Sequence, residues 1–154
     1  MAELPETEAG AEDCGDTCTI DLSKMKGRSP GDAGEPSDQT LIMLTRGTYG
    51  HHDDGFSAIQ VGNALLAEEA GATLLLLDDG VYFAARDQNP TALGLPNNIN
   101  YIEDFLDLGG RLLALVGSLT RRGLLRDDLV KGVDIITPSQ MVREIETHHV
   151  SVTF

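Results

Sequence analysis

The stretch Ala72-Thr-Leu-Leu-Leu-Leu77 is the longest apolar run of the sequence, and it ends in Asp78-Asp79-Gly80. A short apolar run that is bounded by turn residues is typical of a strand buried on both faces. It is far shorter than the roughly eighteen apolar residues that a membrane span requires. The stretch therefore predicts an inner strand of a parallel sheet.

The residues around this strand repeat its pattern from Thr40 onward. Short apolar runs alternate with helix-length amphipathic segments, which is typical of a parallel sheet covered by helices on both faces. Strands are predicted at 40–45, 72–77, 111–116, 133–136 and 149–154, and helices at about 56–70, 99–108 and 138–147. Gly71 should end the first helix, Gly117 and Ser118 should form a turn, and Thr137-Pro138 should begin the last helix. The sequence thus predicts a three-layer α/β fold with a five-stranded parallel sheet in residues 39–154.

The first 38 residues have a different composition. They contain ten acidic and three basic side chains, five glycines and three prolines. Such a segment buries too little apolar surface to offset its chain entropy. It predicts an acidic tail, residues 1–38, that is flexible or that wraps over a partner protein.

Charge and composition exclude several classes of function. The chain has a net charge of −14, which opposes nucleic-acid binding because phosphate recognition needs a basic face. Its amino terminus has neither the basic nor the apolar region of a secretory signal. We therefore expect a cytoplasmic protein whose partners are proteins, in a homo-oligomer or a hetero-complex, rather than nucleic acid or a membrane.

Four segments occur in an order and spacing that match a known family. They are Leu44-Thr-Arg-Gly47, Leu77-Asp-Asp-Gly-Val-Tyr82, Arg121-Arg-Gly123 and Val150-Ser-Val-Thr-Phe154. Together they resemble the DsrE-like family, which includes the sulfur-accepting subunits of the Tus and Dsr relay systems. The resemblance covers residues 40–154 and implies a small α/β fold that assembles into trimers or hexamers.

The resemblance also implies a cysteine at the end of the third strand or just beyond it. In this sequence that position falls at Leu115 or Ser118, and neither is cysteine. A persulfide needs a thiolate that attacks and holds the sulfane sulfur, and a serine hydroxyl cannot do this at neutral pH. The departure favours a subunit that is not catalytic by itself.

Cys14 and Cys18 are the only two cysteines, and both lie in the predicted tail. They are candidate sulfur carriers, although the neighbouring carboxylates disfavour the thiolate form. As a metal site they would supply only two ligands, so a zinc ion or an iron–sulfur cluster would have to be shared with another chain. Inert thiols are the remaining alternative, and no other cofactor is predicted.

A polar loop, residues 51–54, follows the first strand at the edge where open α/β sheets bind ligands. Its two histidines and two aspartates suit a metal or acid–base cluster. The alternative is a polar loop in which Asp53 or Asp54 caps the next helix. The family resemblance brings this loop close to two other turns. The ligand pocket that this implies is formed by Tyr49, His51, Gly80, Tyr82 and Ser118.

These observations predict a non-catalytic, DsrE-like structural or docking subunit of a larger cytoplasmic complex in sulfur or redox metabolism. Two alternatives remain open. One is a sulfurtransferase that carries sulfur on Cys14 or Cys18, and the other is a sensor that binds a small ligand in the pocket beside His51.

Overall fold

The computed structural model describes residues 39–47, 49 and 53–154, all of which belong to one compact unit. Its strands are β1 (Gln39–Leu44), β2 (Gly71–Leu76), β3 (Arg111–Leu115), β4 (Val133–Ile136) and β5 (Val150–Thr153). Its α-helices are α1 (Asp54–Ala67), α2 (Asn98–Asp107), α3 (Val116–Arg121) and α4 (Pro138–Thr147). Three short 3₁₀ segments complete it: η2 (Asp78–Ala84), η3 (Pro90–Leu93) and η4 (Arg126–Asp128). The predicted tail, with Cys14 and Cys18, lies outside the described residues.

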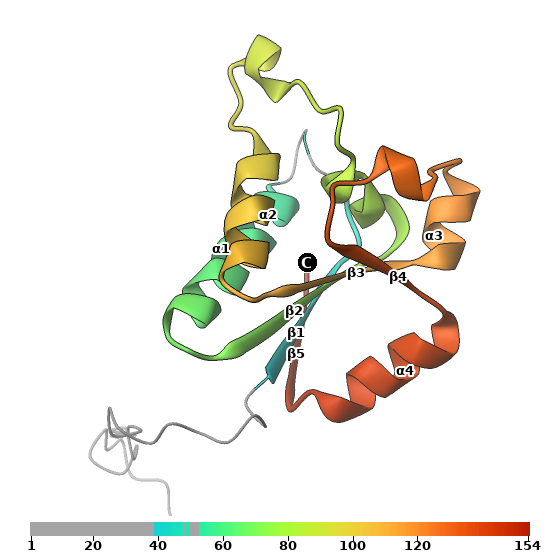
Figure 1. Ribbon diagram of the computed structural model, residues 1–154. Coiled ribbons are helices and arrows are strands. Elements are labelled where there is room, and N and C mark those ends of the chain that lie inside the picture. The colour runs from blue at the N-terminus through green and yellow to red at the C-terminus, as the bar shows by residue number, and fades with distance from the viewer. Residues whose placement is uncertain (1–38, 48, 50–52) are drawn as a thin grey trace, which may run out of the picture. The chain divides into compact units, whose positions relative to one another are not determined.

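The five strands form one parallel sheet in the order β4-β3-β2-β1-β5. The chain adds β2, β3 and β4 on one side of β1 and then returns to place β5 on its other side. Figure 1 shows α1 and α2 on one face of the sheet and α4 on the other. Right-handed crossovers require this arrangement, because reversing the direction of strand addition moves the connecting helix to the opposite face. The predicted three-layer α/β fold with five parallel strands is confirmed.

Alternation along the strands divides the side chains between two cores. In β1, Ile42 and Leu44 point into the core beneath α1 and α2, whereas Leu41 points into the core beneath α4. All three side chains are fully buried. Burial on both faces explains why an inner strand of this sheet is a continuous apolar run and does not alternate with polar residues.

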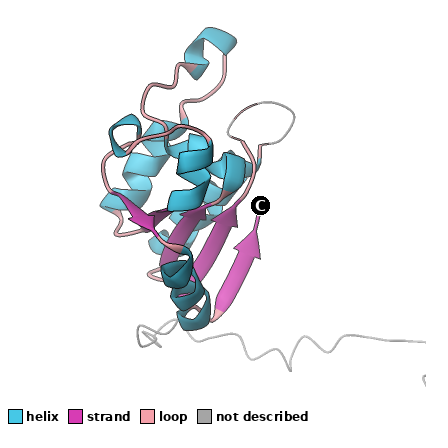
Figure 2. Ribbon diagram, turned by 90° about the vertical axis from the view of Figure 1, so that its right-hand side faces the viewer, coloured by secondary structure: helices cyan, strands magenta, loops and turns pink. Residues whose placement is uncertain are grey.

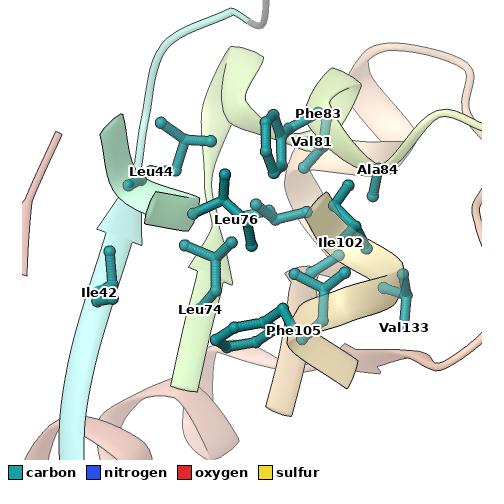
Figure 3. Close-up of a cluster of buried hydrophobic side chains, with 14 of the residues drawn as sticks. Ile42, Leu44, Leu74, Leu76, Val81, Phe83, Ala84, Ile102, Phe105 and Val133 are labelled. Atoms are coloured by element: carbon teal, nitrogen blue, oxygen red, sulfur yellow. The ribbon is translucent and has the colours of Figure 1, made fainter. Parts of the chain in front are cut away.

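The larger core lies between the sheet and the helices α1 and α2. Figure 3 shows Ile102 and Phe105 of α2 beside Leu74 and Leu76 of β2. Phe105 is fully buried and is among the largest side chains of this core. Such residues contribute most of the hydrophobic stabilisation, at about 2–3 kcal/mol for each fully buried large side chain.

Helix α4 begins where the sequence predicts. The Thr137 side chain accepts a hydrogen bond from the Gln140 backbone N–H, and the Gln140 side chain accepts one from the Thr137 N–H at 2.8 Å. Pro138 occupies the first helical position, where its missing N–H has no cost. This capping box provides hydrogen-bond partners for backbone N–H groups at the start of the helix, and both of its residues are close in sequence.

Two polar contacts hold α4 against the sheet. The Arg111 guanidinium of β3 donates two hydrogen bonds to the Glu144 carboxylate, at 3.0 and 2.8 Å. The buried His148 ring places Nε2 3.0 Å from the Thr73 hydroxyl of β2, while Nδ1 lies at the Glu144 backbone carbonyl. Because a carbonyl only accepts, Nδ1 carries a proton. The neighbouring His149 is exposed. The connection between α4 and β5 therefore contains one histidine directed into the core and one directed at solvent.

The Arg111–Glu144 pair should make the stability of the domain depend on acidic pH. Hydrogen bonds from Arg111, together with its charge, hold the pKa of Glu144 below its usual range, and partial burial opposes them. As the pH falls, Glu144 is therefore protonated in the unfolded chain at a higher pH than in the folded domain. The stabilisation that the pair provides is complete above the usual carboxyl pKa of about 4.3. It is lost as the pH falls through the lower pKa of the folded state. Arg111 is half exposed, so the contribution should stay below about 1 kcal/mol.

Urea unfolding between about pH 5 and pH 3 will test this, because the usual carboxyl pKa lies in that interval. Glu144→Gln should lose less stability across that interval than the wild-type protein does. Glu146→Gln, which changes an exposed carboxylate on the same helix, should follow the wild-type curve. Identical curves for all three proteins would contradict a stabilising role for the pair.

Two local predictions are wrong. Gly117 and Ser118 do not form a turn, because α3 begins at Val116 directly after β3 and includes both residues. Gly71 does not end the first helix, because it is the first residue of β2. The helix ends at Ala67, and Glu69, two residues later, takes a left-handed backbone conformation, with φ of 61°.

No helix in the described part of the chain is long and apolar enough to cross a membrane.

Candidate functional site

The candidate site lies where β2 and β3 end. Carboxyl ends of neighbouring parallel strands meet at one edge of the sheet, as the arrows in Figure 2 show. Segment η2 follows β2 after one residue, Leu77, and α3 follows β3 without a break. The two segments pack against each other, which brings residues about 40 positions apart in sequence into contact.

Ser118 joins these two segments. Its hydroxyl oxygen accepts a hydrogen bond from the Asp78 backbone N–H at 2.9 Å, and the residue is only 4% exposed. Asp78 has a positive φ of 44°, which is unfavourable for a residue with a side chain. The bond from Asp78 to Ser118 helps to hold this backbone conformation, so the Ser118 side chain has a structural partner.

Arg122 forms a second connection between the same segments. Its Nε donates to the Asp79 carboxylate at 2.8 Å, and one terminal nitrogen donates to the Ser118 carbonyl at 3.2 Å. The Arg122 side chain is 17% exposed while that of Asp79 is 64% exposed. Arg122 therefore forms an ion pair with an acidic neighbour, and its guanidinium is not directed at open solvent.

Gly80 lies against the end of β1. An added Cβ would stand 2.1 Å from the Leu44 carbonyl oxygen, which already accepts a hydrogen bond from the Leu77 N–H at 2.8 Å. Only glycine allows η2 to approach the backbone this closely. Tyr82, two residues later, is 42% exposed and lies on the outer side of η2.

The predicted pocket residues occupy several places. Gly80 lies on η2 and Ser118 on α3, the two segments that pack together. The Tyr49 hydroxyl accepts a hydrogen bond from the Asn98 N–H at 3.4 Å, at the start of α2. His51 lies outside the described residues, so the complete five-residue pocket stays a prediction.

The predicted sulfur and metal positions lie partly within and partly outside the described residues. Leu115 is the last residue of β3 and is half buried, with a hydrocarbon side chain that offers no ligand or nucleophile. The metal prediction at Cys14 and Cys18 falls outside the described residues. Within residues 39–47, 49 and 53–154, no group of three or more His, Cys, Asp or Glu side chains could hold a metal ion.

Sequence reasoning did not identify the Asp78–Ser118 bond or the Arg122–Asp79 pair. Each joins partners about 40 residues apart, beyond any local pattern. One signal was present, because both aspartates and the serine lie within a few residues of the ends of predicted strands, and the arginine follows a few residues later. Parallel strands bring such positions to one edge.

Comparisons with known proteins agree with this architecture. A family model described as DsrE/DsrF-like family matches residues 38–154. The uncharacterized protein MJ0989 of Methanocaldococcus jannaschii is 26% identical over 113 residues, which cover 73% of this chain and 96% of that protein. The uncharacterized protein MK0008 of Methanopyrus kandleri is 24% identical over 112 residues, with 73% and 90% covered.

Two solved structures share the fold. The ychN protein of E. coli superimposes with a TM-score of 0.66 at 21% identity, covering 75% of this chain and 99% of its own. The protein of unknown function MTH1491 of Methanobacterium thermoautotrophicum gives a TM-score of 0.59 at 18% identity, with 75% and 98% covered. At these identities the likeness shows the fold alone.

Proposed function

The chain belongs to the DsrE/DsrF-like family, and on that premise we propose that it is a non-catalytic subunit that docks within a larger sulfur- or redox-metabolism complex. Membership implies a function related to sulfur relay. A relay step moves sulfane sulfur onto a thiolate, so a subunit without a placed thiol contributes structure and contacts rather than transfer.

The absence of a thiol from residues 39–154 carries this proposal. Both cysteines of the chain precede that part. The position implied by the family resemblance is taken by Leu115, a hydrocarbon, or by Ser118, whose hydroxyl is buried and accepts the Asp78 N–H. A buried hydroxyl engaged in this bond stabilises the strand ends instead of presenting a nucleophile.

Exposed apolar side chains near the same edge support a docking role. Tyr82 is 42% exposed, Val116 is 38% exposed and Leu125 is 70% exposed. They lie on η2, at the start of α3 and just after α3. All three segments follow the carboxyl ends of β2 and β3, and exposed apolar side chains that form a contiguous surface are typical of protein contacts.

Loading with sulfane sulfur tests the non-catalytic assignment. The full-length protein and a Cys14→Ser/Cys18→Ser variant are incubated with polysulfide, and their intact masses are measured. We expect neither protein to gain a sulfur atom. A gain in the wild-type protein that the double variant lacks would replace the proposal with sulfur transfer on Cys14 or Cys18.

Thiol accessibility provides a direct test of the site geometry. In the Cys14→Ser/Cys18→Ser background, a Ser118→Cys thiol should react with an aromatic disulfide reagent at least about tenfold more slowly than a Val116→Cys thiol, because burial limits reagent access and disfavours the thiolate. Val116 is the matched control, two residues away in the same helix and exposed. Equal rates would mean that the Ser118 position is open to a substrate.

Native purification tests the docking role. We expect the tagged wild-type protein to elute in a complex larger than its own mass of 16.5 kDa. A Tyr82→Ser/Leu125→Ser variant should lose this complex while keeping its fold. Leu93→Ser, which removes an apolar side chain that is 76% exposed on η3, should retain it. A wild-type protein that elutes alone would contradict the proposal.

A further inference from the structure

Two adjoining cavities border the loop that leads into β4, and the larger of them also borders α2. Their volumes are about 700 and 310 Å³, and the residues that line both are Arg86, Leu129, Val130, Lys131 and Gly132. A combined space of this size suits a small organic molecule. Neither cavity is lined by Gly80, Tyr82 or Ser118, so this place is separate from the strand-end site.

Positive charge is concentrated around the smaller cavity. Residues 39–154 contain 15 acidic but only 8 basic side chains. Three of those eight, Arg86, Arg126 and Lys131, line the smaller cavity, which has a single carboxylate, Asp127. An excess of cations at one place in an otherwise acidic domain provides electrostatic attraction for an anion.

These cations differ from the other arginines described above. Arg111 and Arg122 each donate hydrogen bonds to a carboxylate of another element at 3.0 Å or less. In the described part of the chain, neither Arg126 nor Lys131 forms an ion pair. Arg86 pairs only with its sequence neighbour Asp87 at 3.6 Å, and both side chains are more than half exposed. The Arg126 guanidinium donates one long hydrogen bond to the Val133 carbonyl, at 3.5 Å. Because a carbonyl carries no net charge, the positive charges of Arg126 and Lys131 are not neutralised by a carboxylate of the described residues and can attract a ligand.

The larger cavity has a different lining. It shares Arg86 and Lys131 with the smaller cavity, but not Arg126, and its apolar lining residues are Ile99, Ile102, Leu106, Leu129 and Val130. Two carboxylates, Glu103 and Asp107, line it on the α2 side. These carboxylates repel an anionic group, so the charged end of a ligand is favoured in the smaller cavity and its apolar part in the larger one.

The backbone holds the cation-bearing segments together. Ala85 and Leu129 form an antiparallel bridge. The Arg86 N–H donates to the Asp128 carbonyl at 2.9 Å, and the Val130 N–H donates to the Ala84 carbonyl at 2.8 Å. Arg86 is thereby fixed beside the segment that bears Lys131 before any ligand arrives. Such preorganisation reduces the entropy that binding would cost.

We propose that the two cavities form one binding site for a small organic anion, with its anionic group at Arg126 and Lys131 and its apolar part along α2. The site goes beyond the docking function, because it gives the folded domain a ligand of its own. Its failure would leave the docking proposal untouched, since Tyr82, Val116 and Leu125 line neither cavity.

Fluorescence titration of the full-length protein with anilinonaphthalene sulfonate tests this site, because the probe combines an anionic group with an aromatic body. We expect saturable binding that an Arg126→Gln/Lys131→Gln variant weakens at least about tenfold, since two attractive charges are lost. Both side chains are exposed, so the variant should fold. Arg121→Gln, an exposed arginine on α3, removes one charge elsewhere and should change the affinity less than about twofold.

Two further measurements separate a built site from general adsorption. Ile99→Trp reduces the volume of the larger cavity without altering any charge, and it should also lower the affinity for anilinonaphthalene sulfonate. Uncharged phenylnaphthylamine should be insensitive to the Arg126→Gln/Lys131→Gln change. The proposal is overturned if the probe does not bind, if the double variant binds as the wild-type protein does, or if Arg121→Gln weakens binding equally.

Discussion

Replacing Gly80 with alanine will destabilise the folded domain by about 3 kcal/mol or more, the upper range for inserting an atom into a packed core. The new Cβ would lie 2.1 Å from the Leu44 carbonyl oxygen and 2.7 Å from its carbon. These are backbone atoms at the end of the inner strand β1, so no side-chain rotation relieves the contact. The change must instead move η2 away from β1, which also disturbs the Leu77–Leu44 hydrogen bond.

Guanidinium unfolding monitored by circular dichroism will measure the loss. Gly117→Ala is the matched control, because an added Cβ there meets no atom within 4 Å and the residue lies in α3. Removing a helical glycine in open space should leave stability unchanged or raise it by up to about 1 kcal/mol. A Gly80→Ala protein as stable as Gly117→Ala would show that η2 does not pack closely on β1.

Replacing Phe105 with alanine will cost about 4 kcal/mol, because it removes a fully buried aromatic ring and leaves a cavity. The ring lies close to Gly62 of α1, where an added Cβ would stand 2.8 Å from Phe105 Cε2. Gly62→Ala should therefore destabilise the wild-type protein by roughly 1–2 kcal/mol through overpacking.

The two changes should be strongly coupled. Without the Phe105 ring, the Gly62→Ala methyl group occupies vacated space and also gains helix propensity, so it should stabilise by up to about 1 kcal/mol. The sign of the Gly62→Ala effect thus reverses between the two backgrounds, and the double-mutant cycle should give a coupling of about 2 kcal/mol. Additive effects would contradict close packing of α1 on α2 through this ring.

The fold was largely predictable because its signals are local. The run at 72–77 marks an inner strand through continuous apolar residues, and Val133–Ile136 was predicted with its observed bounds. Helix α4 begins with a threonine and a proline that satisfy its first turn without distant partners. Local prediction failed at α3. Gly117 and Ser118 are residue types that favour a turn, but here they belong to a helix that packs on η2.

The candidate site was less predictable because its contacts are distant in sequence. Ser118 was identified as a residue of interest, yet its burial and its bond to Asp78 depend on the position of η2 beside α3. The cations Arg86, Arg126 and Lys131 form no motif, since the first is 40 or more residues from the others. They line one cavity only because the Ala85–Leu129 bridge joins their segments.

The sequence by itself determined the alternation of strands and helices, the acidic balance and the confinement of both thiols to residues 1–38. These follow from residue type and short-range periodicity, which need no knowledge of distant neighbours. Tertiary structure alone decided the placement of β5 beside β1, the engagement of Ser118 by Asp78 and the gathering of cations beside α2. Each depends on how the crossovers pack, and packing joins residues that the chain keeps far apart.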